Sequence, residues 1–299
     1  MLKRTLTGAV IFVLTFGFVL LKQFSPLFFD AYVLIVSYAG IYEVSKAYKA
    51  ANKKTHFWAL YLVPALFCVI FNLVKNTANI YAYLLLVVLG VLILGLSADI
   101  IEFAQNRKAN ETVDAEELNK TLFDKTKYTM MVVAYPLVPL MMLFALNHMG
   151  YTLGYIGIIL AFAVSMLTDT CAYFFGVAFG KKKFVPEVSP KKSIEGVFGG
   201  FFGGLVGAGA GFSVFYFTDI LNISQIAPLW VLIVAFALVG VVGSYINQLG
   251  DLVASALKRK VGIKDYAQIF PGHGGFMDRV DGLMFTAAFI FIVFTLLLV

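Results

Sequence analysis

The sequence predicts an all-α, polytopic integral membrane protein, and three observations lead to this fold class. Of the 299 residues, 61% are hydrophobic and 13% are charged, and the mean hydropathy is +0.88, which is too apolar for a domain whose surface faces water. Stretches of about 20 apolar residues, the length that an α-helix needs to cross roughly 30 Å of hydrocarbon, recur along the chain. The basic residues gather between these stretches.

About nine transmembrane helices are expected. The first apolar stretch follows Lys3 and Arg4 and resembles a signal peptide, but its length and the lack of a small-residue cleavage site after it favour a membrane anchor. Trp58 and Trp230 fall near the ends of two stretches, as interfacial anchors do. The expected spans are residues 5–21, 26–45, 57–74, 79–103, 128–147, 151–178, 196–218, 228–250 and 281–299.

The distribution of basic residues predicts the topology. Lys and Arg accumulate in cytoplasmic loops, and nine spans place 21 of the 23 basic residues on one side, leaving Lys22 and Lys75 for the other. The N-terminus is therefore expected in the cytoplasm and the C-terminus outside, with a bacterial plasma membrane as the location. The net charge of +6 suits an anionic inner leaflet, and no nucleic acid partner is expected because the basic residues are scattered among membrane loops.

The chain is expected to divide into two regions of different character. Residues 1–127 hold plain apolar spans and end in a polar, mixed-charge segment, 106–127, which is interpreted as a cytosolic linker. In residues 128–299, glycines, acids and basic clusters enter or border the spans, so this transmembrane region is expected to be catalytic.

A glycine stripe occupies residues 196–211, "GVFGGFFGGLVGAGAG". Glycines at a spacing of four let neighbouring helices approach closely. A phosphate-cradling loop is the alternative, but the segment lacks the GK[ST] ending of a P-loop. The sequence leaves open whether the stripe packs within one chain or between two copies in a homodimer.

Carboxylates cluster at the cytoplasmic ends of the last four expected spans. A carboxylate inside a membrane costs about 2.5–3.5 kcal/mol, so each invites a partner or a function. Asp278 and Asp281 share a helix face, where a divalent cation such as Mg²⁺ would turn their repulsion into coordination; salt bridges to Arg279 are an equally good alternative for that pair alone. The cluster comprises Asp169, Glu195, Asp251, Asp278 and Asp281, whereas Asp30, Glu43, Asp99 and Glu102 are expected to reach the interface.

Fixed cations accompany these acids and favour the metal interpretation. A metal held by carboxylates beside several cations suits a polyphosphate substrate, because the metal bridges phosphate oxygens while Lys and Arg offset the remaining charge. Ser255 lies one turn beyond Asp251 on the same helix face. The cations are Lys258, Arg259, Lys260, Lys264 and Arg279.

The loop before the last span contains Pro271, Gly272, Gly274 and Gly275, which let the backbone turn sharply or approach a ligand. His273 could act as a general base, a phosphate contact or a structural residue of the turn. Because a phosphate nucleophile is already ionised and needs no base, phosphate contact or loop structure is favoured.

A second basic cluster lies between residues 181 and 192. Lys181 to Lys183 are interpreted as a positive flank at the lipid surface. Lys191 and Lys192 follow Ser189 and Pro190 just before a helix start, and substrate contact is as good an interpretation for them as a flank.

The segment "SALKRKVGIKDYAQIFPGHGGFMDRVD" (255–281) resembles the signature of phosphatidate cytidylyltransferases, the CDP-diacylglycerol synthases. Residues 169–196, with Asp169-Thr170, Ala172-Tyr173, Ser189-Pro190-Lys191-Lys192-Ser193 and Glu195-Gly196, resemble another block of the family. Ala254 and Ala267 stand where the family often has Glu and Gly, and Ser193 stands where Thr is common.

The resemblance implies that CTP and phosphatidic acid react to give CDP-diacylglycerol and pyrophosphate, with Mg²⁺ and room for a second cation. It implies Asp251, Asp278, Asp281 and Asp169 as metal ligands, and Asp251, Asp278, Lys264, Arg279 and His273 as catalytic residues. The substrate-binding residues that it implies are Lys258, Arg259, Ser255, Lys191, Lys192, Ser189, Tyr173, Gly274 and Gly275. A site at the cytoplasmic edge of the bilayer would meet both a soluble nucleotide and a lipid.

Two other functions remain open from the sequence. A cation-coupled transporter also uses intramembrane carboxylates, but its acids should lie near the midplane. A CTP-dependent enzyme acting on another lipid phosphate or on a polyprenol would carry similar residues.

Overall fold

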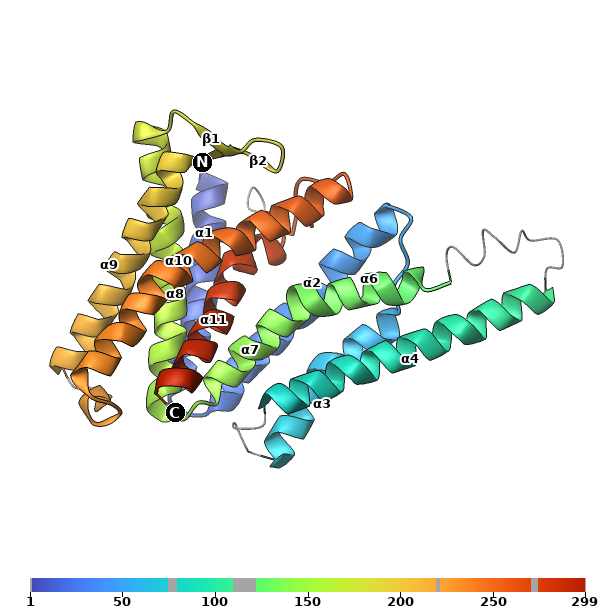
Figure 1. Cartoon of the computed structure of the whole chain (residues 1–299), viewed down its shortest axis with the longest axis horizontal. Coiled ribbons are helices and arrows are strands. Elements are labelled where there is room, and N and C mark those ends of the chain that lie inside the picture. The colour runs from blue at the N-terminus through green and yellow to red at the C-terminus, as the bar shows by residue number, and fades with distance from the viewer. Residues whose placement is uncertain (1, 75–79, 110–121, 219–220, 270–273, 299) are drawn as a thin grey trace. The chain divides into compact units, whose positions relative to one another are not determined.

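The computed structural model describes residues 2–74, 80–109, 122–218, 221–269 and 274–298, and these form helices apart from one two-stranded hairpin (Figure 1). The helices of the first half are α1 (Leu2–Leu21), α2 (Pro26–Ala50), α3 (Phe57–Val74), α4 (Ile80–Ala109), α6 (Asp124–Val132), the π-helical turn η2 (Val133–Leu137) and α7 (Val138–Asn147). The second half contains α8 (Tyr151–Phe179), β1 (Lys183–Val185), β2 (Ser189–Ser193), α9 (Ile194–Thr218), η3 (Ile223–Gln225), α10 (Leu229–Lys260) and α11 (Met277–Leu297).

The expected all-α polytopic membrane class is confirmed. Seven helical segments within the described residues are long and apolar enough to cross a membrane, and one of them joins α6, η2 and α7 through the bend at Pro136. The helices α1 and α3 coincide with the two other expected spans, while the count of nine and the orientation of the termini stay predictions. The seven segments are 26–50, 82–105, 124–147, 151–179, 194–218, 229–260 and 277–297.

The chain divides into two compact units. The first unit contains residues 1–33 and 142–299, and the second unit contains residues 34–141. The boundary expected at residue 127 was drawn from the distribution of chemistry and not from packing, so it stays a prediction. The structural division differs from it because α1 belongs to the same unit as the C-terminal helices.

The core of the first unit is a bundle of α8, α9, α10 and α11, in which α8 and α10 each contact the other three helices (Figure 1). Successive helices reverse direction. The C-terminal ends of α8 and α10 and the N-terminal ends of α9 and α11 therefore lie at one end, together with the β1–β2 hairpin (Figure 1). This hairpin end collects the acids and cations that the sequence places at the ends of the last four spans.

The glycine stripe of α9 lies between α8 and α10. A Cβ atom at Gly203 would come within 2.2 Å of the Leu167 carbonyl oxygen, and one at Gly204 within 2.4 Å of the Gly240 carbonyl oxygen. No side chain fits at either distance, so the stripe permits close packing within one chain. The packing interpretation is confirmed, and a homodimer stays a prediction.

Gly203→Ala should destabilise the bundle, because its methyl group would overlap the backbone of α8. Overpacking of this kind costs about 1–3 kcal/mol, and the loss is measured by thermal unfolding in detergent. The matched control is Gly209→Ala in the same helix, where a Cβ atom would meet nothing within 4 Å. Equal midpoints for the two variants would contradict this account of the stripe.

A buried polar cluster stabilises the opposite end of the first unit. Lys22 is only 5% exposed, and its Nζ donates to the backbone oxygen (2.8 Å) and to Oδ1 (2.6 Å) of Asn147. The Asn147 amide donates to Asp30 Oδ1 at 2.8 Å, and His148 Nε2 lies 3.0 Å from both Asp30 oxygens. These bonds join the turn between α1 and α2 to the segment between α7 and α8.

The expectation that the side chains of Asp30, Glu43 and Asp99 extend to the water of the interface is wrong, because all three are buried within the protein at 5% exposure or less. Asp30 is held by Asn147 and His148, and Asp99 is held by His56 at 2.8 Å. Internal hydrogen-bond partners replace the water that these carboxylates would otherwise seek.

The stability of the first unit should depend on pH through Lys22. Burial lowers the pKa of Lys22 from 10.5 to about 8, although the Asp30 carboxylate acts in the opposite direction. Between pH 8 and 10.5 the unfolded chain therefore binds more protons than the folded chain, so the free energy of unfolding rises with pH. Thermal unfolding should show the wild type gaining stability over this window relative to Lys22→Met. A constant difference between the two proteins would contradict the depressed pKa.

Candidate active site

Asn247 organises the centre of the site. Its side chain is fully buried in α10, and its Nδ2 donates to Asp169 Oδ1 of α8 at 2.8 Å. Its Oδ1 accepts from Ser165 Oγ of α8 at 2.6 Å and from Thr286 Oγ1 of α11 at 3.2 Å. One amide thus links three helices and orients the Asp169 carboxylate, as a satisfied buried network can.

Asp251 lies one turn after Asn247 on α10, and it contacts the β1–β2 hairpin. Lys192 of β2 reaches it with an Nζ to Oδ2 distance of 2.6 Å, and the same Nζ lies 3.3 Å from the Gln248 carbonyl oxygen. Ser255 Oγ is 3.5 Å from Asp251 Oδ1. Because side chains alternate along a strand, Lys191 is exposed while Lys192 turns toward the helices. The Asp251 side chain stays 36% exposed, so it is open to a ligand.

Asp278 closes the loop between α10 and α11. Its Oδ1 accepts from Lys258 Nζ at 2.7 Å, and its Oδ2 accepts from the backbone N–H groups of Tyr266 (3.1 Å) and Gly275 (2.9 Å). The Asp278 side chain is only 4% exposed. Three donors already satisfy this carboxylate, which favours a role in holding the loop over direct contact with a metal ion, and its assignment as a ligand stays a prediction.

Gly274 makes this enclosure possible. Its φ of +79° is in the left-handed region, and a Cβ atom there would lie 2.7 Å from Asp278 Oδ2. Only glycine therefore lets the loop wrap around the carboxylate, which supports the expectation that the backbone turns sharply here.

The carboxylates of Asp169, Asp251 and Asp281 lie close enough to interact unfavourably with one another. Lys192 and Arg279 offset the charge of Asp169, and Lys258 offsets that of Asp281. Three acids from three helices therefore share one electrostatic environment with three cations. Such an arrangement can hold a cation, a phosphate chain or both.

An apolar cavity of about 460 Å³ adjoins these charges in the first unit. Asp169 and Arg279 are its charged lining residues, and aliphatic and aromatic side chains make up most of the remainder. Apolar walls with a few polar groups are typical of ligand sites. The other lining residues are Thr15, Phe16, Val19, Tyr32, Ile159, Phe162, Ala163, Ser165, Met166, Val280 and Leu283.

Comparison with known proteins identifies the family. A sequence model described as "Cytidylyltransferase family" matches residues 2–297. The chain belongs to the cytidylyltransferase family. Curated proteins named phosphatidate cytidylyltransferase match part of it, including that of Staphylococcus haemolyticus (strain JCSC1435), 41% identical over 168 residues, and that of Staphylococcus aureus (strain COL), 39% identical over 168 residues. Each match covers 56% of this chain and 58% of the relative, so the chain spans little more than half the length of these relatives.

Among the described residues, several others expected from the sequence make no hydrogen bond or ion pair with the central acids. Lys191, Lys264, Arg259 and Tyr173 are exposed, and Arg259 Nη1 donates to the Ile263 carbonyl oxygen at 3.1 Å. Ser189 pairs with Val185 in the hairpin. His273 lies outside the described residues. None of these assignments to substrate or catalysis is tested by the geometry, and they stay predictions.

Asn247 and the α1 side chains are the main components of the site that sequence reasoning missed. A signal for Asn247 existed, because an amide four residues before Asp251 in an apolar helix has to find buried partners. Thr15, Phe16 and Val19 of α1 carried no signal, since apolar residues that line a cavity look like those that face lipid.

The donor set fits Mg²⁺ in its chemistry. Among the described residues, no three His, Cys, Asp or Glu side chains converge as a complete metal site. Mg²⁺ does not require such a cage, because it is commonly held by one or two carboxylates together with water and substrate phosphates. Asp251 and Asp281, with Asp169 nearby, offer suitable hard oxygen ligands.

Asp281→Asn should lower turnover, whereas Asp278→Asn should lower stability. Asp281→Asn removes a carboxylate that its neighbours repel, so the protein should keep its thermal stability. Its turnover should fall on the order of a hundredfold to a thousandfold, as is typical when one electrostatic group leaves an active site. Asp278→Asn leaves Lys258 buried without its partner and should lower the free energy of unfolding by about 3–5 kcal/mol.

Thermal unfolding and turnover, measured on the same preparations, separate the two roles. If Asp278→Asn melted like the wild type while Asp281→Asn melted much earlier, the roles given to these two carboxylates would be reversed.

Proposed function

We propose that the protein transfers CMP from CTP to phosphatidic acid, giving CDP-diacylglycerol and pyrophosphate. The observation that carries this proposal is the meeting of an acid and cation cluster with an apolar cavity at Asp169 and Arg279. A lipid phosphate needs an apolar wall for its chains and a cation for its headgroup, and a nucleotide triphosphate needs further cations beside them. The family membership and the names of the curated relatives support the same reaction.

In this proposal a phosphate oxygen of phosphatidic acid attacks the α-phosphorus of CTP. The bond between that phosphorus and the oxygen that bridges to the β-phosphate breaks, and pyrophosphate leaves in line. The attacking oxygen is already ionised, so no general base is required. Catalysis then consists of positioning and of charge stabilisation.

The residues divide between the two substrates. Arg279 lines the apolar cavity and would bind the lipid phosphate, while Asp169, held by Asn247, lines the same cavity with the opposite charge. Lys192 and Lys258 would meet the triphosphate from the hairpin and from α10, with Lys264 at the exposed edge. Each of these two lysines pairs with a carboxylate, which fixes the position of its ammonium group beside the site.

Mg²⁺ would be held by Asp251 and Asp281, with Asp169 close by, and would supply charge neutralisation of the triphosphate. A second cation belongs to the same proposal, because three carboxylates repel one another at this end of the bundle. We place the site at the cytoplasmic face of a bacterial plasma membrane. The basic residues of the hairpin and of the end of α10 share that end, as the positive-inside rule requires.

The reaction is tested with purified protein in mixed micelles containing Mg²⁺, labelled CTP and phosphatidic acid. We expect labelled CDP-diacylglycerol and pyrophosphate in equal amounts. Micelles hold no gradient, so turnover there excludes obligate transport. Absence of CDP-lipid with every divalent cation, or clear preference for another lipid phosphate or a polyprenol, would overturn the proposal.

Arg279→Ala should raise KM for phosphatidic acid at least about tenfold, because it removes a charge-assisted contact to the lipid phosphate. KM for CTP should change much less. Lys183→Ala is the control, since Lys183 is an exposed cation of the hairpin that does not line the cavity. If the effect fell on KM for CTP instead, Arg279 would belong to the nucleotide.

A further inference from the structure

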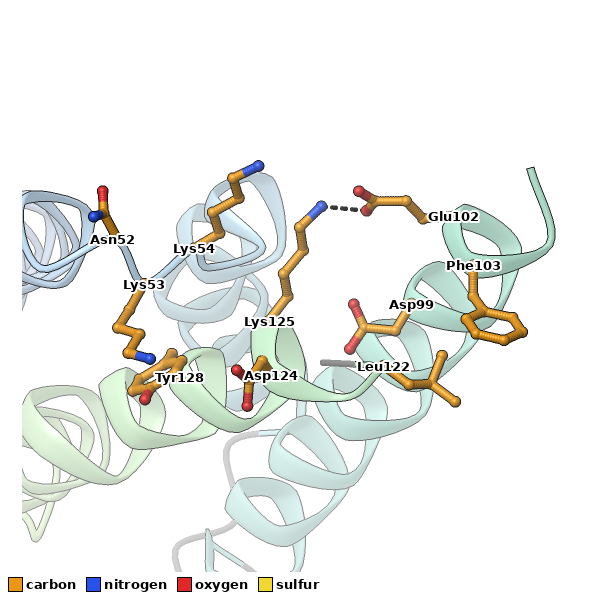
Figure 2. Close-up of a pocket in the computed structure, with 10 residues that line it drawn as sticks. All are labelled: Asn52, Lys53, Lys54, Asp99, Glu102, Phe103, Leu122, Asp124, Lys125 and Tyr128. Carbon is orange, nitrogen blue, oxygen red and sulfur yellow. Dashed lines mark hydrogen bonds and ion pairs between the residues drawn. The ribbon is translucent and has the colours of Figure 1, made fainter. Parts of the chain in front are cut away.

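The second unit contains a cavity of its own, with a volume of about 290 Å³ (Figure 2). Its size is near the lower end of the roughly 300–1,000 Å³ range of small-molecule sites, which suits a headgroup better than a whole lipid. It is lined by Asn52, Lys53, Lys54, Asp99, Glu102, Phe103, Leu122, Asp124, Lys125 and Tyr128.

A rigid set of buried contacts forms one wall of this cavity. Asp99 of α4 is 4% exposed, and its Oδ1 lies 2.8 Å from His56 Nε2 while its Oδ2 accepts from the Thr126 N–H at 3.1 Å. The His56 N–H donates to Thr129 Oγ1 at 2.8 Å. The start of α3, the end of α4 and the start of α6 are thereby joined around one carboxylate. These bonds within the protein hold the wall in place without a ligand.

The turn after α2 directs two lysines to this cavity. Asn52 has a φ of +57°, and the Lys53 N–H donates to the Tyr48 carbonyl oxygen at 2.8 Å, a left-handed ending for which Asn is well suited. The Lys53 ammonium lies 5.4 Å from the centre of the Tyr128 ring, and Lys54 extends beside Lys125 (Figure 2).

The lining carries three lysines and three carboxylates, and they are not all paired with one another. Asp99 is occupied by His56 and the Thr126 N–H, and Glu102 is paired with Lys125. Lys53 and Lys54 have no ion pair with any described residue, and Asp124 is the one lining carboxylate left to oppose them. The cavity therefore offers two ammonium groups and the Asn52 amide to an anion, and the Tyr128 ring contacts the Lys53 ammonium.

The cavity lies at the depth of lipid headgroups. It is formed where the candidate spans 26–50 and 82–105 end and where the span 124–147 begins. Trp58, 51% exposed, lies in the first turn of α3 with its ring 6.2 Å from that of His56, and exposed Trp marks the membrane–water interface. The apolar lining residues Phe103 and Leu122 suit the carbon atoms next to a phosphate.

We propose that this cavity binds the phosphate group of a phospholipid headgroup, with Lys53 and Lys54 as its cations. The site is separate from the residues assigned to CMP transfer, and it does not depend on that reaction. It would tie the second unit to the anionic lipids of the membrane.

Binding is tested by calorimetry on the full-length protein in detergent, without CTP. The probe is short-chain phosphatidylglycerol, whose phosphate is a diester and therefore differs from the substrate proposed for the active site. We expect Lys53→Gln with Lys54→Gln to weaken binding at least about tenfold, since two charge-assisted contacts are lost.

The matched control is Lys46→Gln with Lys49→Gln. It removes the same charge from exposed positions of α2 that do not line the cavity, and it should change the affinity less than about twofold. Should the double variant of Lys53 and Lys54 fail to fold, Lys54→Glu, at an exposed position, should still weaken binding more than Lys49→Glu.

If the two double variants weakened phosphatidylglycerol binding equally, the binding would come from general surface charge and the proposal would be overturned. The absence of any binding would overturn it as well. Inorganic phosphate is then tested as a competitor of phosphatidylglycerol. If it displaced phosphatidylglycerol at equal concentration, the ligand would be a soluble anion and the assignment to a lipid would be wrong.

Discussion

The need to compensate carboxylates away from bulk water governs the first unit. At its hairpin end, Asp169, Asp251, Asp278 and Asp281 each depend on a specific donor: Asn247, Lys192, Lys258 and a backbone N–H. The first three donors come from another helix or from the hairpin, so satisfying these acids also helps to assemble the bundle, whereas the donor to Asp281 is the backbone of its own helix. A buried charge without its partner would be strongly destabilising, and this coupling makes the site and the fold inseparable.

The same pairing does not enclose all of the carboxylates equally. Asp278 is enclosed, whereas Asp251 is still 36% exposed and Asp281 faces the repulsion of its neighbours. The mutual repulsion of Asp169, Asp251 and Asp281 favours a bound cation, and the paired lysines hold positive charge beside it for a phosphate. A bound cation would offset the charge of the carboxylates and of the phosphate chain, as in other phosphoryl-transfer sites.

The second unit also places acids beside lysines, but it pairs them differently. There the buried carboxylate of Asp99 is fully occupied, and Lys53 and Lys54 near the ends of spans have no ion pair with a described residue. Cations near the ends of spans suit contact with anionic lipid. In the proposed functions, the carboxylates of the first unit would hold a cation, and the lysines of the second unit would hold an anion.

Composition and the length of apolar stretches were enough to establish a helical membrane protein, because the cost of unpaired backbone in lipid leaves few alternatives. The local spacing of Lys258, Asp278 and Asp281 was enough to predict a site, and the resemblance to one family identified the reaction to test. Tertiary structure alone decided that Asp278 is enclosed by three donors while Asp251 stays partly exposed, since these acids look alike in the sequence. It also revealed the roles of Asn247 and α1, because a side chain acquires its partners only when distant helices pack together.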